Sequence, residues 1–236
     1  IGAVIPFLGQ RYHVKSHEER GVVLEDTEQH LKTEAGFFSV LSRSDIFDGI
    51  GYGDISAYHG SLNIVMNFTG YKLVDERNGE TVRTGGDSDA LFLNNLHSFW
   101  IDVPESEEAL GGIGAVEHMI RVGAMFVIPA DRFDTSTCSR TGSELAAYCY
   151  ENYPGGIGVA KKLFNVWHVA LEKGLEIAQN CRCSSGCQNC IEPAKSWDIS
   201  NANIDKVIGI QLAEELLSAV RRGPDRRFRN GLMMSV

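Results

Sequence analysis

The spacing of apolar residues changes near Pro104, and this change predicts a β-rich first half and a helical second half. Before Pro104 apolar residues recur at every second position, which is the period of a strand with one buried face. The clearest example is residues 61–69, where an apolar face alternates with a more polar one. The apolar face consists of Leu62, Ile64, Met66 and Phe68. Residues 97–103 repeat the pattern, with Phe99, Ile101 and Val103 on one face, so both segments are predicted strands.

Three shorter segments carry strand-forming residues between glycine or charged turns. They cover residues 3–8, 11–14 and 21–25, and they are predicted to form a meander of short strands. The strand at 61–69 continues through residues 71–76 and meets Asn78-Gly79, a strong signal for a β-hairpin. The chain should turn there and return along residues 80–84.

Beyond Pro104 the apolar residues follow the i, i+3, i+4 spacing of helices. This spacing predicts helices over residues 114–126 and 159–179, and a last helix that starts after Ser200-Asn201 and ends at Arg222. A strand at residues 144–153 should run directly into the glycine-rich turn at residues 154–158.

Four cysteines lie within ten residues, in the sequence CRCSSGCQNC between the last two predicted helices. They are Cys181, Cys183, Cys187 and Cys190. Thiolates bind zinc, and four of them complete a tetrahedral shell with no open position for water or substrate. Gly186 precedes Cys187 and can take the positive φ that turns the backbone toward an ion. The cluster therefore predicts a structural Zn²⁺ site that joins two helices.

Two other uses of the four thiols are compatible with the sequence. An iron–sulfur cluster also takes four cysteines, although this spacing differs from the ferredoxin patterns. Disulfides would need an oxidising compartment, and a bridge between Cys181 and Cys183 would be strained because the two residues are so close in the chain. The remaining cysteines, Cys138 and Cys149, lie in ordinary surroundings. Zinc is the leading prediction.

The order of elements indicates an α+β fold, in which a β-rich N-terminal half is followed by helices joined by a four-cysteine zinc loop. We expect three segments along the chain. They are a β-rich accessory region at 1–104, a mixed α/β domain at 105–222, and a basic tail at 223–236.

The composition, 43% hydrophobic and 22% charged residues, is that of a globular protein with its own core. No apolar run approaches the roughly 18 residues of a membrane span, so no membrane partner is expected. Six cysteines without a secretory pattern predict a cytoplasmic protein. The chain starts at Ile1 without a methionine, which we interpret as a piece of a longer polypeptide.

Two groups of basic residues stand out against the net charge of −9. Lys161 and Lys162 follow the glycine-rich turn, which could bind a phosphate, although a tight strand-to-helix turn also explains its glycines. Arg226, Arg227 and Arg229 surround an aromatic residue, a combination that can contact a single strand but also suits a solvated tail. These five residues are the candidate nucleic-acid contacts.

No catalytic residue is predicted. His118 lies beside Glu117 on a predicted helix and has no second histidine at helical spacing, so we interpret it as a partly buried structural histidine. The chain has no Gly-x-Ser-x-Gly elbow. It also has neither a phosphate-binding Gly-Lys-Thr loop nor a DE-x-H box, so it cannot hydrolyse ATP alone.

From residue 145 to residue 217 the order of features resembles the MrfA-like zinc-binding domain, which occurs at the C-terminus of DEAD/DEAH-type superfamily-two helicases. The features are the sequence Pro-Gly-Gly-Ile-Gly, a long helix, the motif CRCSSGCQNCIEP, and Asn203-Ile-Asp-Lys before the last helix. The N-terminal part agrees less specifically with the segment before that module. One departure is Gln188, where a proline commonly follows Gly-Cys in the family. The resemblance assigns zinc to the four cysteines.

The resemblance implies a C-terminal accessory region of a helicase-like protein that serves DNA repair. Such a region would assist nucleic-acid binding or unwinding by an upstream ATP-dependent motor, with the helicase motor domains and single-stranded DNA as partners. The alternative is a protein-interaction scaffold without nucleic-acid contact, like the DrmB component of the DISARM anti-phage system. The acidic net charge favours this alternative.

Overall fold

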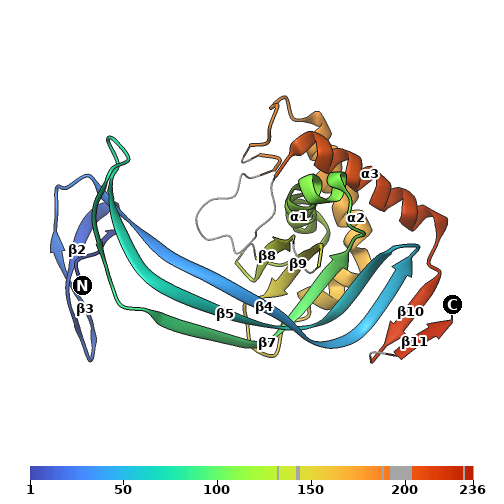
Figure 1. Cartoon of the computed structure of the whole chain (residues 1–236), viewed down its shortest axis with the longest axis horizontal. Coiled ribbons are helices and arrows are strands. Elements are labelled where there is room, and N and C mark those ends of the chain that lie inside the picture. Colours follow the sequence, from blue (N-terminus) through green and yellow to red (C-terminus); the bar gives the residue numbers. More distant parts are fainter. Residues whose placement is uncertain (132, 142–143, 188, 192–203, 231, 236) are drawn as a thin grey trace. The chain divides into compact units, whose positions relative to one another are not determined.

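The computed structural model of the chain falls into two compact units (Figure 1). Unit 1 comprises Ile1–Val40 and Ile64–Phe92, and unit 2 comprises Leu41–Asn63 and Leu93–Val236. The three segments expected from the sequence are a different division and stay a prediction about domain organisation. The structure describes residues 1–131, 133–141, 144–187, 189–191, 204–230 and 232–235.

Unit 1 consists of strands. An antiparallel sheet has the order β1-β2-β3, with β1 at Val4–Phe7, β2 at Gln10–Glu18 and β3 at Gly21–Asp26. After the turn at Asn78-Gly79 the chain returns as β6 (Thr81–Gly85), which pairs with β5. The expected β-rich N-terminal half with a meander is confirmed.

Three long strands contribute residues to both units. They are β4 (Leu31–Tyr52), β5 (Ile55–Asp75) and β7 (Asp89–Asp102). The strand predicted at residues 61–69 and its predicted continuation through 71–76 are confirmed as one strand, β5, which begins six residues earlier at Ile55. β4 was not expected, because its first fifteen positions only alternate between exposed and half-buried and form no apolar face. Its hydrogen bonds with β5 stabilise it instead.

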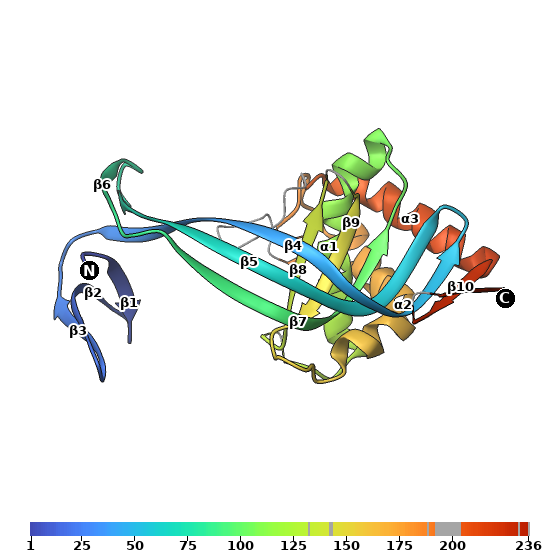
Figure 2. The ribbon, with the colours of Figure 1, turned by 60° about the horizontal axis from the view of Figure 1, so that its bottom comes forward.

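The sheet of unit 2 continues on both sides of these strands, in the order β11-β10-β4-β5-β7-β9-β8 (Figure 2). β8 is Thr135–Arg140 and β9 is Ala146–Glu151, the strand expected before the glycine-rich turn. The segment expected as a basic tail contains two further strands, β10 (Arg226–Arg229) and β11 (Leu232–Ser235). They form ordered structure because β10 adds to the edge of β4, with Phe228 opposite Gly49.

Three helices complete unit 2: α1 (Glu107–Val127), α2 (Val159–Asn180) and α3 (Lys206–Arg222). α1 begins seven residues before the predicted 114, because Ser106 caps it; the Ser106 Oγ accepts a 3.0 Å hydrogen bond from the Ala109 N–H. The cap expected at Ser200-Asn201 lies outside the described residues. Asp205 caps α3 and accepts from the N–H groups of its first turn.

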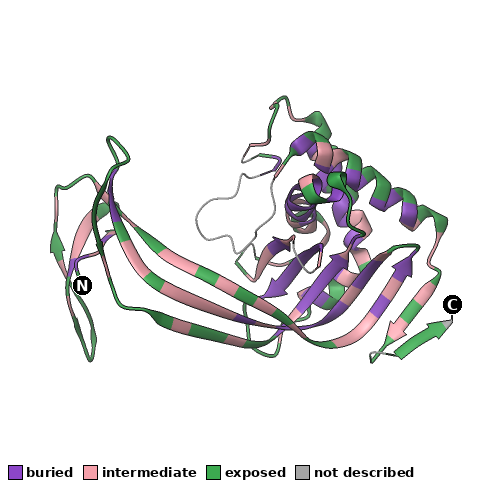
Figure 3. Ribbon diagram, in the orientation of Figure 1, coloured by how far each residue is buried: buried purple, intermediate pink, exposed green. Residues whose placement is uncertain are grey.

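The helices form the core of unit 2 together with one face of the sheet. α1 and α2 pack on β8 and β9, and α3 packs on α1 and α2. Figure 3 shows the buried residues concentrated in the helices and in the neighbouring strands. The face predicted for the strand at 97–103 is confirmed, since Phe99, Ile101 and Val103 all belong to this core.

Two glycines let α1 and α2 approach closely. A Cβ at Gly123 of α1 would overlap the carbonyl oxygen of Ala170, and a Cβ at Gly174 of α2 would overlap that of Met119. Both glycines are buried. Their small size therefore sets the distance between the two helices, and α2 carries the cysteine loop at its end.

α1 also has the length and mean hydropathy of a helix that could cross a membrane, although no apolar run of that kind was expected from the sequence. More than half of its most apolar window, 56%, is buried inside the protein. The residues of α1 that face α2 and α3 belong to the core. This burial gives the helix a role in packing.

Candidate metal centre

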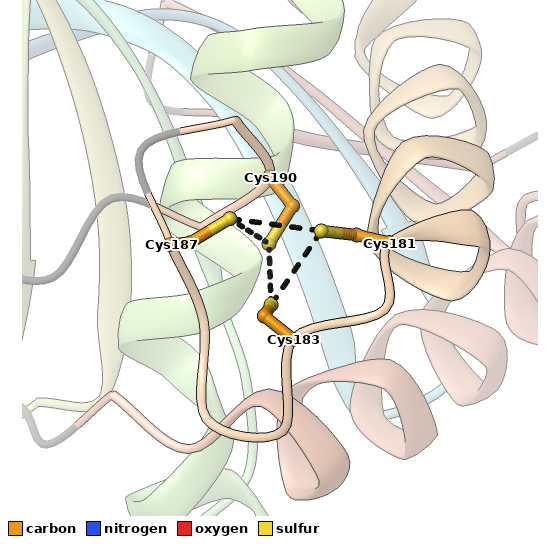
Figure 4. A group of neighbouring side chains, drawn as sticks. All are labelled: Cys181, Cys183, Cys187 and Cys190. Atoms are coloured by element: carbon orange, nitrogen blue, oxygen red, sulfur yellow. Dashed lines mark hydrogen bonds between the residues drawn. The ribbon is translucent and has the colours of Figure 1, made fainter.

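The four cysteines come from the end of α2 and the loop that follows it (Figure 4). Cys181 is the C-cap of α2, and its N–H donates to the Ile177 carbonyl at 3.1 Å. Cys190 is buried, and Ile191 beside it is fully buried in the core. Both ends of the loop are thus attached to packed structure, and the sulfur atoms point toward one another.

The separations of the sulfur atoms match a single tetrahedral ion. Neighbouring Sγ atoms lie 3.5 Å (Cys181–Cys183), 3.6 Å (Cys181–Cys187), 3.3 Å (Cys183–Cys190) and 3.7 Å (Cys187–Cys190) apart. All four ligand atoms lie within 4.8 Å of one another. A tetrahedron with Zn–S bonds of about 2.3 Å requires S–S separations of about 3.8 Å. The cluster therefore fits Zn²⁺ without a change of fold.

The same separations argue against the other uses of the thiols. A disulfide brings its sulfurs to about 2.05 Å, and all four cysteines are free. In a four-iron cluster each thiolate binds a different iron, which requires a wider ring of sulfurs than this one. A single ion with four thiolates is the arrangement that the geometry supports.

A turn and a buried lysine complete the site. Gly186 has a φ of 108°, and the Cys190 N–H donates to the Cys187 carbonyl at 3.0 Å, so the loop folds back as its glycine predicted. Lys206, the first residue of α3, is only 6% exposed. Its Nζ donates to the carbonyls of Cys181 and Cys183, both at 2.8 Å.

Lys206 places a positive charge beside the metal centre and partly offsets the excess negative charge of four thiolates around one divalent ion. A Zn²⁺ ion with four thiolates carries a formal charge of about −2, and the Lys206 ammonium lies 3.4 Å from the Cys183 sulfur. Sequence reasoning missed this residue because it lies 23 positions after Cys183. The signals were its place in the motif Asn203-Ile-Asp-Lys and the presence of a lysine at the start of a helix, where an acidic residue is favoured.

The surroundings shift the pKa values of Cys183 and Cys190 in opposite directions. A hydrogen bond from Cys190 lowers the pKa of Cys183 to about 6, and Lys206 acts in the same direction. Burial raises the pKa of Cys190 to about 12. A metal ion that binds here meets one thiol that is already ionised at neutral pH, and it has to displace the proton of another.

The glycine-rich turn before α2 is closed by a carboxylate of the protein itself. Glu151 at the end of β9 is fully buried, and it accepts from the N–H groups of Ile157, Gly158 (3.2 Å) and Ala160 (2.7 Å). A phosphate at this helix start would have to displace Glu151. The turn therefore has the structural role that its glycines also allowed.

The structure brings some of the five basic candidates together and separates others. Lys161 and Lys162 lie exposed in the first turn of α2. Arg226 is half-buried; it donates to the Gly53 carbonyl and lies 3.4 Å from the Asp225 carboxylate. Arg227 and Arg229 are exposed and line a groove beside α2.

The fold and the thiol cluster define a zinc-binding α+β domain with a structural metal centre. Residues 116–191 match the family model of the MrfA Zn-binding domain. The resemblance inferred from the cysteine motif is confirmed, as is Zn²⁺ as the cofactor.

Two curated proteins are similar to parts of the chain. An uncharacterised protein, MJ1572.1 of Methanocaldococcus jannaschii, is 37% identical over 71 residues, which are 30% of this chain and 62% of that protein. The uncharacterised ATP-dependent helicase YprA of Bacillus subtilis is 27% identical over 106 residues, 39% of this chain and 14% of the helicase. The chain thus spans less than two thirds of either relative.

Solved structures share the fold over most of the chain. The DUF1998 helicase MrfA bound to DNA matches 92% of this chain and 30% of its own, with a TM-score of 0.58 and 18% identity. Another crystal structure of the DUF1998 helicase MrfA matches 92% of this chain and 29% of its own, with a TM-score of 0.53 and 19% identity. At this identity the likeness shows a common fold.

Proposed function

We propose that the chain is an accessory region of a helicase-like protein, in which one zinc ion holds α2 and α3 together beside a surface for DNA. It assists the binding or unwinding of nucleic acid by an ATP-dependent motor in DNA repair. The observation that carries the proposal is the thiol cluster, which sits at the end of α2 and contacts the start of α3 through Lys206.

Zinc has a structural role in this proposal. Its ligands are the four cysteines, whose separations leave no space for a fifth ligand. Zinc that binds four thiolates contributes on the order of 10 kcal/mol in small zinc domains. The ion would hold the C-terminus of α2 against the N-terminus of α3. Zinc-binding thiols need a reducing compartment, which supports a cytoplasmic location.

Three observations support a partnership with a motor. The chain shares its fold with a helicase, and the sequence itself contains no ATP-binding loop. Unit 1 also exposes large apolar side chains on its strands, among them Phe38, Val40 and Phe92. Such side chains on a protein surface favour contact with another domain. We propose that helicase motor domains cover them.

Contact with DNA is supported by the exposed basic side chains. Lys161, Lys162, Arg227 and Arg229 are exposed, although the whole chain is acidic. The fold neighbour MrfA is described as bound to DNA. A basic patch on an acidic protein binds the phosphate backbone locally and with a strong dependence on salt.

The second candidate function is a protein-interaction scaffold like DrmB of anti-phage defence. The net charge of −9 and the exposed apolar side chains of unit 1 favour it. It makes the opposite prediction for DNA, because an acidic scaffold has no affinity for a polyanion.

Binding of a labelled single-stranded oligonucleotide to the zinc-loaded chain, followed by fluorescence anisotropy, separates the two functions. We expect binding at low salt that weakens steeply as salt rises. Replacing Lys161, Lys162, Arg227 and Arg229 with alanine should abolish it. If the wild-type chain does not bind the oligonucleotide even at low salt, the scaffold is the better explanation.

A further inference from the structure

A groove of about 420 Å³ runs between α2 and the edge of the unit 2 sheet. β4 and β10 form its floor, where Asp48 and Ile50 of β4 lie opposite Arg229 and Arg227 of β10. Residues paired in register point to the same face of a sheet, so all four side chains face α2. The groove lies wholly within unit 2.

The floor of the groove carries more positive than negative charge. Arg227 and Arg229 are both exposed, and among the described residues neither has an ion pair within 4.0 Å. Asp48 is the acidic residue of the lining. Two guanidinium groups against one carboxylate leave an excess of one positive charge and many unused donors. An anionic ligand would satisfy these donors.

The wall of the groove adds polar side chains and aromatic surface; the Asn165 amide donates one hydrogen bond to the Lys161 carbonyl at 3.0 Å. Phe164, Asn165 and His168 of α2 line it, at helical positions that share one face. Lys161 lies one turn earlier on the same face. The wall thus places an amide and an imidazole beside a ring, and a lysine toward one end. This combination contacts phosphate, sugar and base together.

We propose that this groove binds the backbone of single-stranded DNA, with Arg227 and Arg229 on neighbouring phosphates and Phe164 beside a base. The inference deepens the proposed function and rests on it. Arg227 and Arg229 are two residues apart on a strand, so they are about 7 Å apart, which is comparable to the separation of neighbouring phosphates in a single strand. A row of charges at this spacing suits a polymer better than one phosphate.

The test fills the groove without changing its charge. In Asn165→Trp a large neutral ring takes the place of an exposed amide on the groove wall. We expect its Kd for a labelled oligothymidylate to rise at least tenfold. Gln179→Trp is the matched control, because Gln179 is also neutral, exposed and on α2 but lies outside this groove. Its Kd should stay within twofold of the wild type.

A second pair of variants tests the arginines. Arg227→Ala with Arg229→Ala should weaken binding at least tenfold and flatten its dependence on salt. Arg221→Ala with Arg222→Ala removes the same charge from the exposed last turn of α3 and should have a small effect. Circular dichroism and the zinc content of each variant confirm that the fold is kept.

The outcomes distinguish the groove from the proposed function. If the wild type binds DNA but Asn165→Trp binds equally well, the groove is not the binding site, and the proposed function stands. Equal losses in the two arginine pairs would also overturn the groove, because general surface charge would explain them. If the wild type does not bind, both proposals fail. Thymidine monophosphate and oligothymidylate can also be compared as competitors at the same nucleotide concentration. If they compete equally, the groove binds a single nucleotide, and the proposal that it binds a strand is wrong.

Discussion

The ammonium group of Lys206 lies 3.4 Å from the sulfur of Cys183, and it also donates to the carbonyl oxygens of Cys181 and Cys183. One side chain at the start of α3 thus contacts the backbone and a thiol of the loop that ends α2. A buried ammonium group needs such partners, because burying a charged group without hydrogen bonds is costly. Lys206 therefore couples the metal centre to the packing of the helices.

Lys206→Met should weaken zinc binding. The variant keeps the bulk of the side chain but removes the charge next to the thiolates, and loss of a group that supports metal ligands typically costs about 10- to 100-fold in affinity. Competition with a chromogenic chelator measures this. Lys173→Met is the control, because Lys173 is exposed and paired with Glu176 at 2.9 Å. Equal zinc affinity in both variants would show that Lys206 has no part in the site.

Removal of zinc should destabilise unit 2. We expect one zinc ion per group of four thiols, absence of visible colour, and a clear fall in Tm when a chelator removes the ion. Cys190→Ser should abolish stoichiometric zinc, whereas Cys138→Ser should retain it, since Cys138 lies outside the cluster. Elemental analysis and thermal unfolding give the answer. A chain that contains no metal and keeps its Tm after all four thiols are replaced would refute the metal centre.

Zinc affinity should fall as the pH falls. The pKa of Cys183 is lowered to about 6, mainly by its hydrogen bond with Cys190, so this thiol is ionised at neutral pH. A lowered pKa contributes stability above the ordinary thiol pKa of about 8.5, and this contribution is lost as pH falls through about 6. Protons then compete with the metal for the sulfur. A chelator titration across this range should show weaker zinc binding at the acid end; a flat profile would contradict it.

Glu151→Gln should lower the stability of the chain. The buried carboxylate accepts from three N–H groups at the start of α2, and hydrogen bonds to a charged group contribute about 1.5–3 kcal/mol. The amide keeps the shape but loses the charge and can orient a donor toward these N–H groups. Thermal unfolding should show the loss. Glu176→Gln, an exposed change on the same helix, should leave the Tm nearly unchanged.

Gly174→Ala should also destabilise the chain, although alanine is the better helix former. Intrinsic propensity favours alanine by about 1 kcal/mol, but the new Cβ would overlap the Met119 carbonyl and force α1 and α2 apart. Overpacking of this kind costs about 1–3 kcal/mol. Denaturant unfolding measures whether the free energy of unfolding falls or rises in Gly174→Ala. Glu176→Ala is the control on the same helix. A gain in stability would mean that the two helices can separate without cost.

Local patterns in the sequence determined the helices and the metal centre. The stripe of apolar residues predicts α2 within one residue of its observed end at Asn180. The cysteines and Gly186 lie within ten residues, so their spacing alone limits which ligands can meet. The alternation of Phe99, Ile101 and Val103 likewise predicted which face of β7 is buried. In each case neighbouring residues carry the information, because helix and strand periods act over a few positions.

Tertiary structure decided the features that depend on distant residues. β4 and β10 carry weak strand patterns, and they become strands because each pairs with a neighbour far away or across a turn. Lys206 joins the metal centre and Glu151 fills the glycine-rich turn, both through contacts that the local sequence pattern does not predict. The groove with Arg227 and Arg229 exists only because β10 lies beside α2. Periodicity is a property of the local backbone, whereas these contacts depend on which surfaces the folded chain brings together.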